Sequence, residues 1–208
     1  MLTEDFSALQ ALYDDISSLI VKLAAAGTHD GDFLHPVFGE GSMASGLLLF
    51  GEAPGAEEAA LGHPFVGKAG RQLDELLLAA GIMREEVYIS NIVKYRPVKR
   101  SERSIRNRTP TRQEVEAFLP SIACEIKLLC PRMIATLGNT PLQAILKIAG
   151  EAPQTIGACH GRPSSMVVAG RPCTLFPLYH PASGIYNRSL VDVMLADARL
   201  LGEQMVKR

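Results

Sequence analysis

Short, fully apolar segments alternate with helical ones along this chain, and this alternation constrains its fold more than any other feature. In chain order, we expect a strand at 47–50, a helix at 69–80, a strand at 87–89, a helix from Thr111 to about Leu129, a strand at 133–137 and a helix from Asn139 or Thr140. Strands that alternate with helices form a parallel sheet covered on both faces. We therefore predict an α/β fold.

The remaining segments fit a single domain. Residues 3–26 predict an amphipathic helix, 27–46 a loop, 166–168 and 174–176 a hairpin, and 188–206 a final helix. With 208 residues, of which 47% are hydrophobic and 21% charged, the chain is able to bury one core. We expect one domain over 1–208, with an N-terminal helix and loop at 1–36 and a motif-bearing core at 37–208.

Neither a membrane segment nor a secretion signal is expected. No apolar run reaches membrane-spanning length, and the first five residues lack the basic start of a signal peptide. We therefore expect a cytoplasmic protein without a membrane partner. The net charge of −1 gives no global basic field, although a local basic patch would suffice to bind nucleic acid.

Small and polar residues directly follow three of the expected strands. They are Gly51-Glu52-Ala53-Pro54-Gly55 after the first strand, Asn91 after the second, and His180-Pro181 after the last. Ligands of parallel α/β sheets bind beyond the carboxyl ends of the strands. We expect all three segments to lie on one rim of the sheet.

A run of basic residues extends from Lys94 to Arg112 and contains a single acid, Glu102. Such a run is in general a solvated, flexible loop. Its position beside the strand-end residues favours contact with DNA phosphates instead. The basic residues that we expect at the DNA are Lys94, Arg96, Arg100, Arg103 and Arg106.

Two features suggest phosphate or metal binding, but neither has the residues that such a site needs. Residues 62–69 nearly match a phosphate-binding loop, but Ala69 replaces the hydroxyl that holds magnesium, and no strand directly precedes the segment. The cysteines form no C-x-x-C pair and lack the spacing of a metal site. They are Cys124, Cys130, Cys159 and Cys173.

Taken together, these segments resemble the family four uracil-DNA glycosylases. The motifs that match in order and spacing are Gly51–Gly55, Gly62–Gly70, Asn91–Lys94 and Tyr179–Ala182, within a match from Phe38 to the end of the chain. The resemblance implies a three-layer α/β/α sandwich with a short, mainly parallel central sheet. It also implies a hydrolase of base excision repair that cleaves the N-glycosidic bond of uracil in single- or double-stranded DNA. We expect this enzyme to be a monomer.

The chain departs from that family at the iron–sulfur cluster. Family four enzymes typically hold the cluster with two N-terminal cysteines, one in a Lys-Cys-Arg-Pro motif and one on the following helix. Here the N-terminal pair is missing, Tyr95 takes the motif position, and Phe118 replaces the helix cysteine. We expect no cluster, metal or other cofactor, with aromatic rings filling part of the vacated volume. The basic insertion at 99–106 holds no histidine, so the covalent trapping of a related subgroup is not expected.

The chemistry of the resembled family assigns roles to three residues. A uracil inside a duplex has to be flipped out, at a cost of a few kcal/mol, before its glycosidic bond is accessible. Phe65 would stack on the base, Asn91 would read N3–H and O4, and His180 would donate to O2 as charge develops on the base. Each also has an ordinary alternative: a core aromatic, a turn residue at a strand end, and a histidine bonded to backbone.

The sequence constrains two further roles less: the catalytic acid, and the side chain that fills the gap left by the flipped base. Glu52, with Glu58 as a second candidate, is the expected catalytic acid near the sugar, where it would orient water or stabilise the cation. Ala53 stands where other glycosylase families carry an acidic base, so the acting group stays open. In the loop 183–186, Ile185 or Tyr186 is expected to fill the gap left by the flipped base.

Two interpretations of function follow. The first is an active, monofunctional uracil-DNA glycosylase without a metal, in which the loop 51–55 binds substrate. The second is a catalytically weak nucleic-acid-binding member of the same fold, which the loss of the cluster cysteines suggests. The four residues Glu52, Phe65, Asn91 and His180 are all retained, and this favours the active enzyme.

Overall fold

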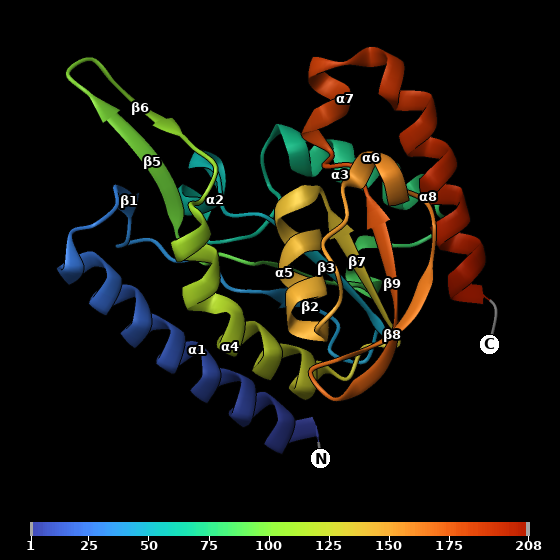
Figure 1. The fold of residues 1–208 in the computed structure, drawn as a ribbon, viewed down its shortest axis with the longest axis horizontal. Coiled ribbons are helices and arrows are strands. Elements are labelled where there is room, and N and C mark those ends of the chain that lie inside the picture. Colours follow the sequence, from blue (N-terminus) through green and yellow to red (C-terminus); the bar gives the residue numbers. More distant parts are fainter. Residues whose placement is uncertain (1, 207–208) are drawn as a thin grey trace.

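The computed structural model describes residues 2–206, and a six-stranded sheet lies at its centre (Figure 1). In spatial order the strands are β2 (Glu40–Gly41), β4 (Tyr88–Asn91), β3 (Leu47–Gly51), β7 (Met133–Leu137), β9 (Arg171–Leu178) and β8 (Ser164–Val168). The inner strands run parallel, whereas β2 and β8 pair antiparallel at the two edges. The predicted hairpin is confirmed as β8–β9.

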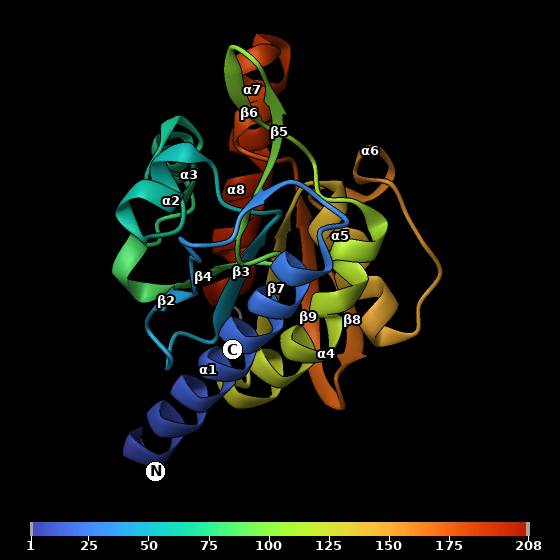
Figure 2. The same cartoon turned by 90° about the vertical axis from the view of Figure 1, so that its left-hand side faces the viewer.

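Helices cover both faces of this sheet. On one side lie α1 (Leu2–Ala26), α4 (Arg112–Leu129) and α5 (Asn139–Ala149), and on the other α3 (Lys68–Ala79) and α8 (Val191–Val206) (Figure 2). Successive side chains of a strand point to opposite faces. Accordingly, Leu48 and Phe50 of β3 join the first core, and Leu47 and Leu49 join the second. The predicted three-layer α/β/α fold is confirmed.

Short helices make most of the remaining connections. They are α2 (Ala56–Leu61), η1 (Arg84–Glu86), α6 (Ile156–Cys159), α7 (Ala182–Tyr186) and η2 (Arg188–Leu190). The segment 183–186, which we expected as a loop, is therefore helical, and the final helix begins only after η2. Across residues 2–206, no helix combines the length and the apolar character that crossing a membrane requires.

Helix α4 begins where its capping box predicts. The Thr111 hydroxyl accepts from the Glu114 amide at 3.2 Å, and the Glu114 carboxylate accepts from the Thr111 amide at 2.7 Å. Such a cap contributes about 1 kcal/mol to helix stability. Glu114 is only 1% exposed, so it has partners beyond the cap.

The basic segment is a β-hairpin and not the loop that its charge suggests. Strands β5 (Arg96–Ser101) and β6 (Ser104–Asn107) pair antiparallel, and β1 (Gly31–Asp32) adds to the other edge of β5. The hairpin projects from the body of the protein (Figure 1). Val98 and Ile105 share one face of the hairpin, but the surrounding charges hide this alternation in the sequence.

Candidate active site

A cleft of about 930 Å³ opens at the C-terminal edge of the parallel strands. It brings together segments far apart in the sequence, because β3, β4 and β9 all end at this edge. The residues predicted from the sequence that line it are Glu52, Ala53, Pro54, Gly55, Glu58, Phe65, Asn91, His180, Ile185 and Tyr186. The predicted rim is thereby observed.

Gly51 and Asn91 lie side by side beneath this cleft, in register on neighbouring strands. A Cβ on Gly51 would stand 2.4 Å from the Asn91 side-chain oxygen and 2.6 Å from the Phe65 ring. Carbon atoms normally stay about 3.5 Å or more apart, so only glycine fits between the amide and the ring. Asn91 is itself 3% exposed and lines the cleft.

The Phe65 ring forms an apolar wall of the cleft. Its backbone is left-handed, with φ of 53°, a conformation that is costly for a bulky residue and often found at functional sites. Gly70, in the first turn of α3, permits the conformation, because a Cβ there would stand 1.9 Å from the Phe65 carbonyl oxygen. The ring centroid lies 6.1 Å from that of His180, with the planes 33° apart.

His180 is held as a neutral imidazole with a defined tautomer. The Ala182 backbone N–H donates to Nδ1 at 3.1 Å. A backbone amide only donates, so Nδ1 is the unprotonated nitrogen and Nε2 carries the proton. Burial lowers the pKa of His180, and the charge of Glu58 opposes this shift. The cleft therefore contains a neutral ring with an Nε2–H donor.

Glu52 follows β3 directly and is held by a threonine. The Thr140 hydroxyl donates to its Oε2 at 2.6 Å. Burial raises the pKa of Glu52, and hydrogen bonding by Thr140 and Thr109 partly offsets the shift. The Oε2 oxygen is thus held by Thr140, and Thr109 also bonds to this carboxylate.

Glu58 is occupied by backbone amides. Its Oε1 accepts from Val66 and Gly67 at 3.1 and 2.9 Å, and its Oε2 accepts from Gly55 at 3.1 Å. The same carboxylate caps helix α2. These bonds tie the loop 51–55 to the loop that carries Phe65.

Lys94 lies inside the protein and not at a DNA-binding surface. Its side chain is 0% exposed, and Nζ forms an ion pair with Glu125 at 2.7 Å. The Tyr13 hydroxyl also donates to Glu125, at 3.1 Å. Burial lowers the pKa of Lys94, and Glu125 opposes this. The predicted phosphate contact of Lys94 is wrong, because an amine without exposed surface cannot reach a phosphate.

The other basic residues of the prediction lie on the hairpin. Arg100, Arg103 and Arg106 are exposed, and Arg96 is half-buried with Nε donating to Asn107 at 2.7 Å. The register pairs Lys99 with Arg106 and Arg100 with Ile105, which places Arg100 and Arg106 on opposite faces. Arg100 shares its face with Asn107, a residue of the cleft.

The residues at the cluster positions do not fit an iron–sulfur cluster. Tyr95 and Phe118 are both buried, with ring centroids 6.0 Å apart, and neither carries a sulfur ligand. Cys124 and Cys130 are exposed, while Cys159 and Cys173 are buried elsewhere. Within the described part of the chain, no three His, Cys, Asp or Glu side chains are grouped to hold a metal ion.

Sequence reasoning missed Thr140 and Thr109, which act on Glu52, and the Ala182 amide, which orients His180. Thr140 could have been predicted as a site residue, since it follows β7 at the same edge of the sheet. The contact of the Ala182 amide could not have been predicted, because it depends on the turn of the backbone after β9.

A recessed amide, an aromatic wall and a neutral imidazole thus lie together at the C-terminal edge of the parallel sheet in this α/β/α protein. Residues 38–199 match the family model of the uracil DNA glycosylase superfamily. The chain belongs to this superfamily, and within it to the type-4 uracil-DNA glycosylases, as which its relatives of 32–41% identity are named.

Three relatives named type-4 uracil-DNA glycosylase illustrate the match. The protein of Pyrobaculum aerophilum is 41% identical over 152 residues, which cover 73% of this chain and 74% of that protein. That of Thermotoga maritima is 34% identical over 180 residues, or 86% of each chain. That of Archaeoglobus fulgidus is 32% identical over 170 residues, or 82% of each.

Proposed function

We propose that the protein removes uracil from DNA by hydrolysing the bond between N1 of the base and C1′ of deoxyribose, and leaves an abasic site for repair. The observation that carries this proposal is the fixed Nε2–H tautomer of His180, which shares one cleft with the Asn91 amide and the Phe65 ring. The names of the relatives support the same activity.

Base recognition rests on Phe65 and Asn91. A flipped uracil stacks on the Phe65 ring, and the Asn91 oxygen accepts from N3–H while its NH₂ group donates to O4. Cytosine presents an acceptor and a donor at these two places in the reverse order. Its entry leaves buried polar groups unpaired, at about 1–3 kcal/mol each.

Bond cleavage rests on His180 and Glu52. As the bond breaks, N1 keeps the electron pair, and the His180 Nε2–H donates to O2 of the departing uracil anion. A donor aimed at developing charge is worth roughly 3–4 kcal/mol in comparable sites. Water adds to C1′ through its oxygen, and the Glu52 carboxylate accepts the water proton after stabilising the sugar cation.

We assign Glu58 a holding role in place of the catalytic one. A carboxylate that accepts three backbone N–H groups is already satisfied, and moving it to a water would release both loops.

Two projections flank the cleft and support DNA binding there. The β5–β6 hairpin and helix α7 rise from the same end of the protein in both views (Figures 1 and 2). Arg100 and Arg103 on the hairpin would contact phosphates. Ile185 and Tyr186 on α7, 43% and 88% exposed, are the candidates to fill the gap in the duplex. The substrate is uracil-containing DNA, single- or double-stranded, and the enzyme works as a cytoplasmic monomer without an iron–sulfur cluster.

The test uses oligonucleotides with one uracil, as a single strand and in duplex, followed by alkaline cleavage of abasic sites. After treatment with wild-type protein and then alkali, the strand should be cleaved at the uracil, and the matched thymine strand should stay intact. His180→Ala should slow single-turnover excision by about 10²–10³-fold. His35→Ala is the control, because this histidine lies outside the cleft and its side chain is 60% exposed.

Wild-type protein that binds the oligonucleotide without excising uracil would refute the proposed glycosylase activity. That result would favour the catalytically weak binding protein.

A further inference from the structure

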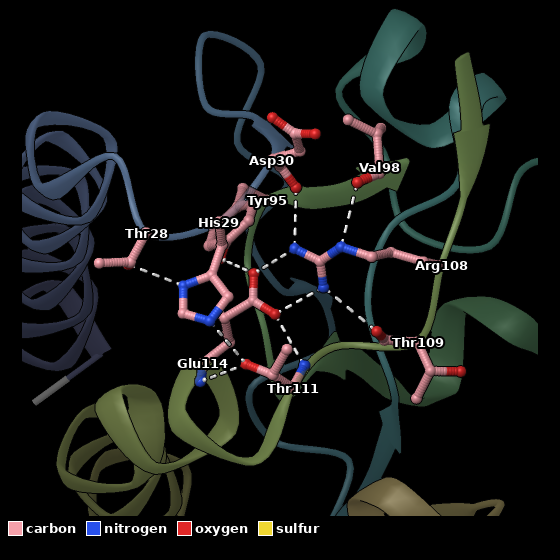
Figure 3. Close-up of polar contacts among 9 residues, drawn as sticks. All are labelled: Thr28, His29, Asp30, Tyr95, Val98, Arg108, Thr109, Thr111 and Glu114. Carbon is pink, nitrogen blue, oxygen red and sulfur yellow. Dashed lines mark hydrogen bonds and ion pairs between the residues drawn. The ribbon is translucent and has the colours of Figure 1, made fainter. Parts of the chain in front are cut away.

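Arg108 differs from the other basic residues of its segment, because all its N–H donors are used inside the protein. Nε donates to the Val98 carbonyl at 3.0 Å. Nη1 donates to the Thr109 carbonyl at 3.2 Å and to Glu114 at 2.6 Å, and Nη2 donates to the Asp30 carbonyl at 2.8 Å and to Glu114 at 2.7 Å (Figure 3). The guanidinium has five donors, so none is left for a phosphate.

Glu114 joins further groups to this arginine. The Tyr95 hydroxyl donates to Oε1, and the Thr111 amide donates to Oε2 at 2.7 Å (Figure 3). Burial alone would raise the pKa of Glu114, but the hydrogen bonds from Arg108, Tyr95 and Thr111 outweigh it and lower the pKa to about 2. The carboxylate is therefore ionised, and the bidentate geometry is that of a strong ion pair.

These contacts connect segments distant in sequence at the cluster positions. Asp30 precedes β1, Tyr95 precedes β5, Arg108 follows β6, and Glu114 lies in the first turn of α4. The resembled cluster would join the N-terminal segment, the residue at 95 and helix α4. Here the centroid of the Tyr95 ring lies 4.5 Å from that of Phe33 and 6.0 Å from that of Phe118, so three aromatic rings lie together at these positions.

The same contacts hold one rim of the cleft. Asn107, Arg108 and Thr109 all line it. The side-chain nitrogen Nδ2 of Asn107 stands 3.3 Å from where a Cβ of Gly55 would lie, so this rim contacts the loop 51–55. The Arg108 amide also donates to the Pro97 carbonyl at 3.1 Å, which closes the base of the hairpin.

We propose that Arg108 is a positioning residue. With Glu114 and Tyr95 it forms a clasp of hydrogen bonds that joins the elements that a cluster would join. The clasp fixes the angle of the β5–β6 hairpin and the place of the rim 107–109. Its consequence for DNA rests on the proposed function, whereas its consequence for the hairpin does not.

Hydrogen exchange on the purified full chain, with uracil excision measured in parallel, tests this clasp. The variants are Arg108→Ala and Arg108→Lys. Arg112→Ala is the matched control, since it removes an arginine four residues away whose side chain is 86% exposed in a surface ion pair. In Arg108→Ala, amides of 98–108 should exchange at least about tenfold faster, as expected when hydrogen bonds to a charged group are lost. Amides of β3 and β7 should keep wild-type exchange.

In the same variants, the DNA concentration for half-maximal excision should change more than the maximal excision rate. Half-saturation by DNA should rise about tenfold in Arg108→Ala, whereas the maximal single-turnover rate should fall less, because His180 and Asn91 stay in place. Arg108→Lys should recover part of the hairpin protection, since its amine reaches Glu114 without serving both Asp30 and Val98. Should Arg108→Ala fail to fold, Tyr95→Phe removes a single hydroxyl and should still speed hairpin exchange.

Hairpin exchange and DNA half-saturation equal to those of Arg112→Ala would overturn the clasp. A fall in melting temperature without faster exchange of the hairpin amides would also overturn the clasp. If wild type excises no uracil, the proposed function fails, and the exchange result still decides the clasp.

Discussion

Adding one methyl group at Gly51 tests the pocket more directly than removing any of its side chains. In Gly51→Ala the new Cβ would stand 2.4 Å from the Asn91 oxygen and 2.6 Å from the Phe65 ring. Carbon needs about 3.5 Å from its neighbours, so the amide and ring have to retreat by about 1 Å. Neither chemical group is lost, and only their placement changes.

The magnitude follows from that displacement. A misplacement of about 1 Å at a reacting centre costs about 10²-fold in rate. Overpacking a core by a methyl costs about 1–3 kcal/mol of stability, and each kcal/mol lowers the melting temperature of a chain of this size by about 2–4 °C. We therefore expect a folded variant that excises uracil about 10²-fold more slowly under single-turnover conditions.

Gly157→Ala provides the matched control. Its Cβ would meet only the Tyr179 hydroxyl, at an ordinary 3.9 Å, in the short helix α6. Both variants should be assayed on the same uracil oligonucleotide well below their melting temperatures. A Gly51→Ala protein with wild-type excision would show that Asn91 and Phe65 do not form the base pocket.

Four further predictions concern base choice, cofactor, DNA and acid. Asn91→Asp should strongly reduce excision of uracil and raise the relative use of cytosine, and unchanged uracil rates would reduce Asn91 to a turn residue. Protein purified anaerobically should be colourless, and stoichiometric iron with a broad visible band would contradict this. Arg100→Ala should lower the salt slope of DNA binding by roughly one, whereas Arg106→Ala, on the opposite face, should change it less. Glu114 has a pKa of about 2 in the fold, below its ordinary value near 4.5, so its contribution to stability is present above pH 4.5 and lost toward pH 2. Glu114→Gln should flatten that fall in acid titrations of the unfolding free energy.

The layers of the fold and most of the cleft could be predicted from the sequence, because both follow from local patterns. Apolar runs such as 47–50 and 133–137 indicate buried strands, and the parallel arrangement puts their C-terminal ends at one edge. That rule is enough to predict that Glu52, Asn91 and His180 lie together, and all three line the cleft.

The contacts that local patterns did not indicate involve residues whose partners are distant in sequence. Lys94 looked like part of a basic patch because its partner Glu125 is 31 residues away on α4. Glu58 looked like a free acid because two of the three amides that it binds belong to a loop eight and nine residues on. Local charge and composition carry no information on such pairings.

The Glu58 carboxylate has a consequence for how the pocket responds to change. It receives N–H groups from Gly55 on one loop and from Val66 and Gly67 on the other, so a displacement of either loop weakens bonds to both. The loop 51–55 and the aromatic wall therefore behave as one mechanical unit. Substitutions in the two loops should be non-additive, and mutations that adapt the pocket to another base should arise in pairs across this carboxylate.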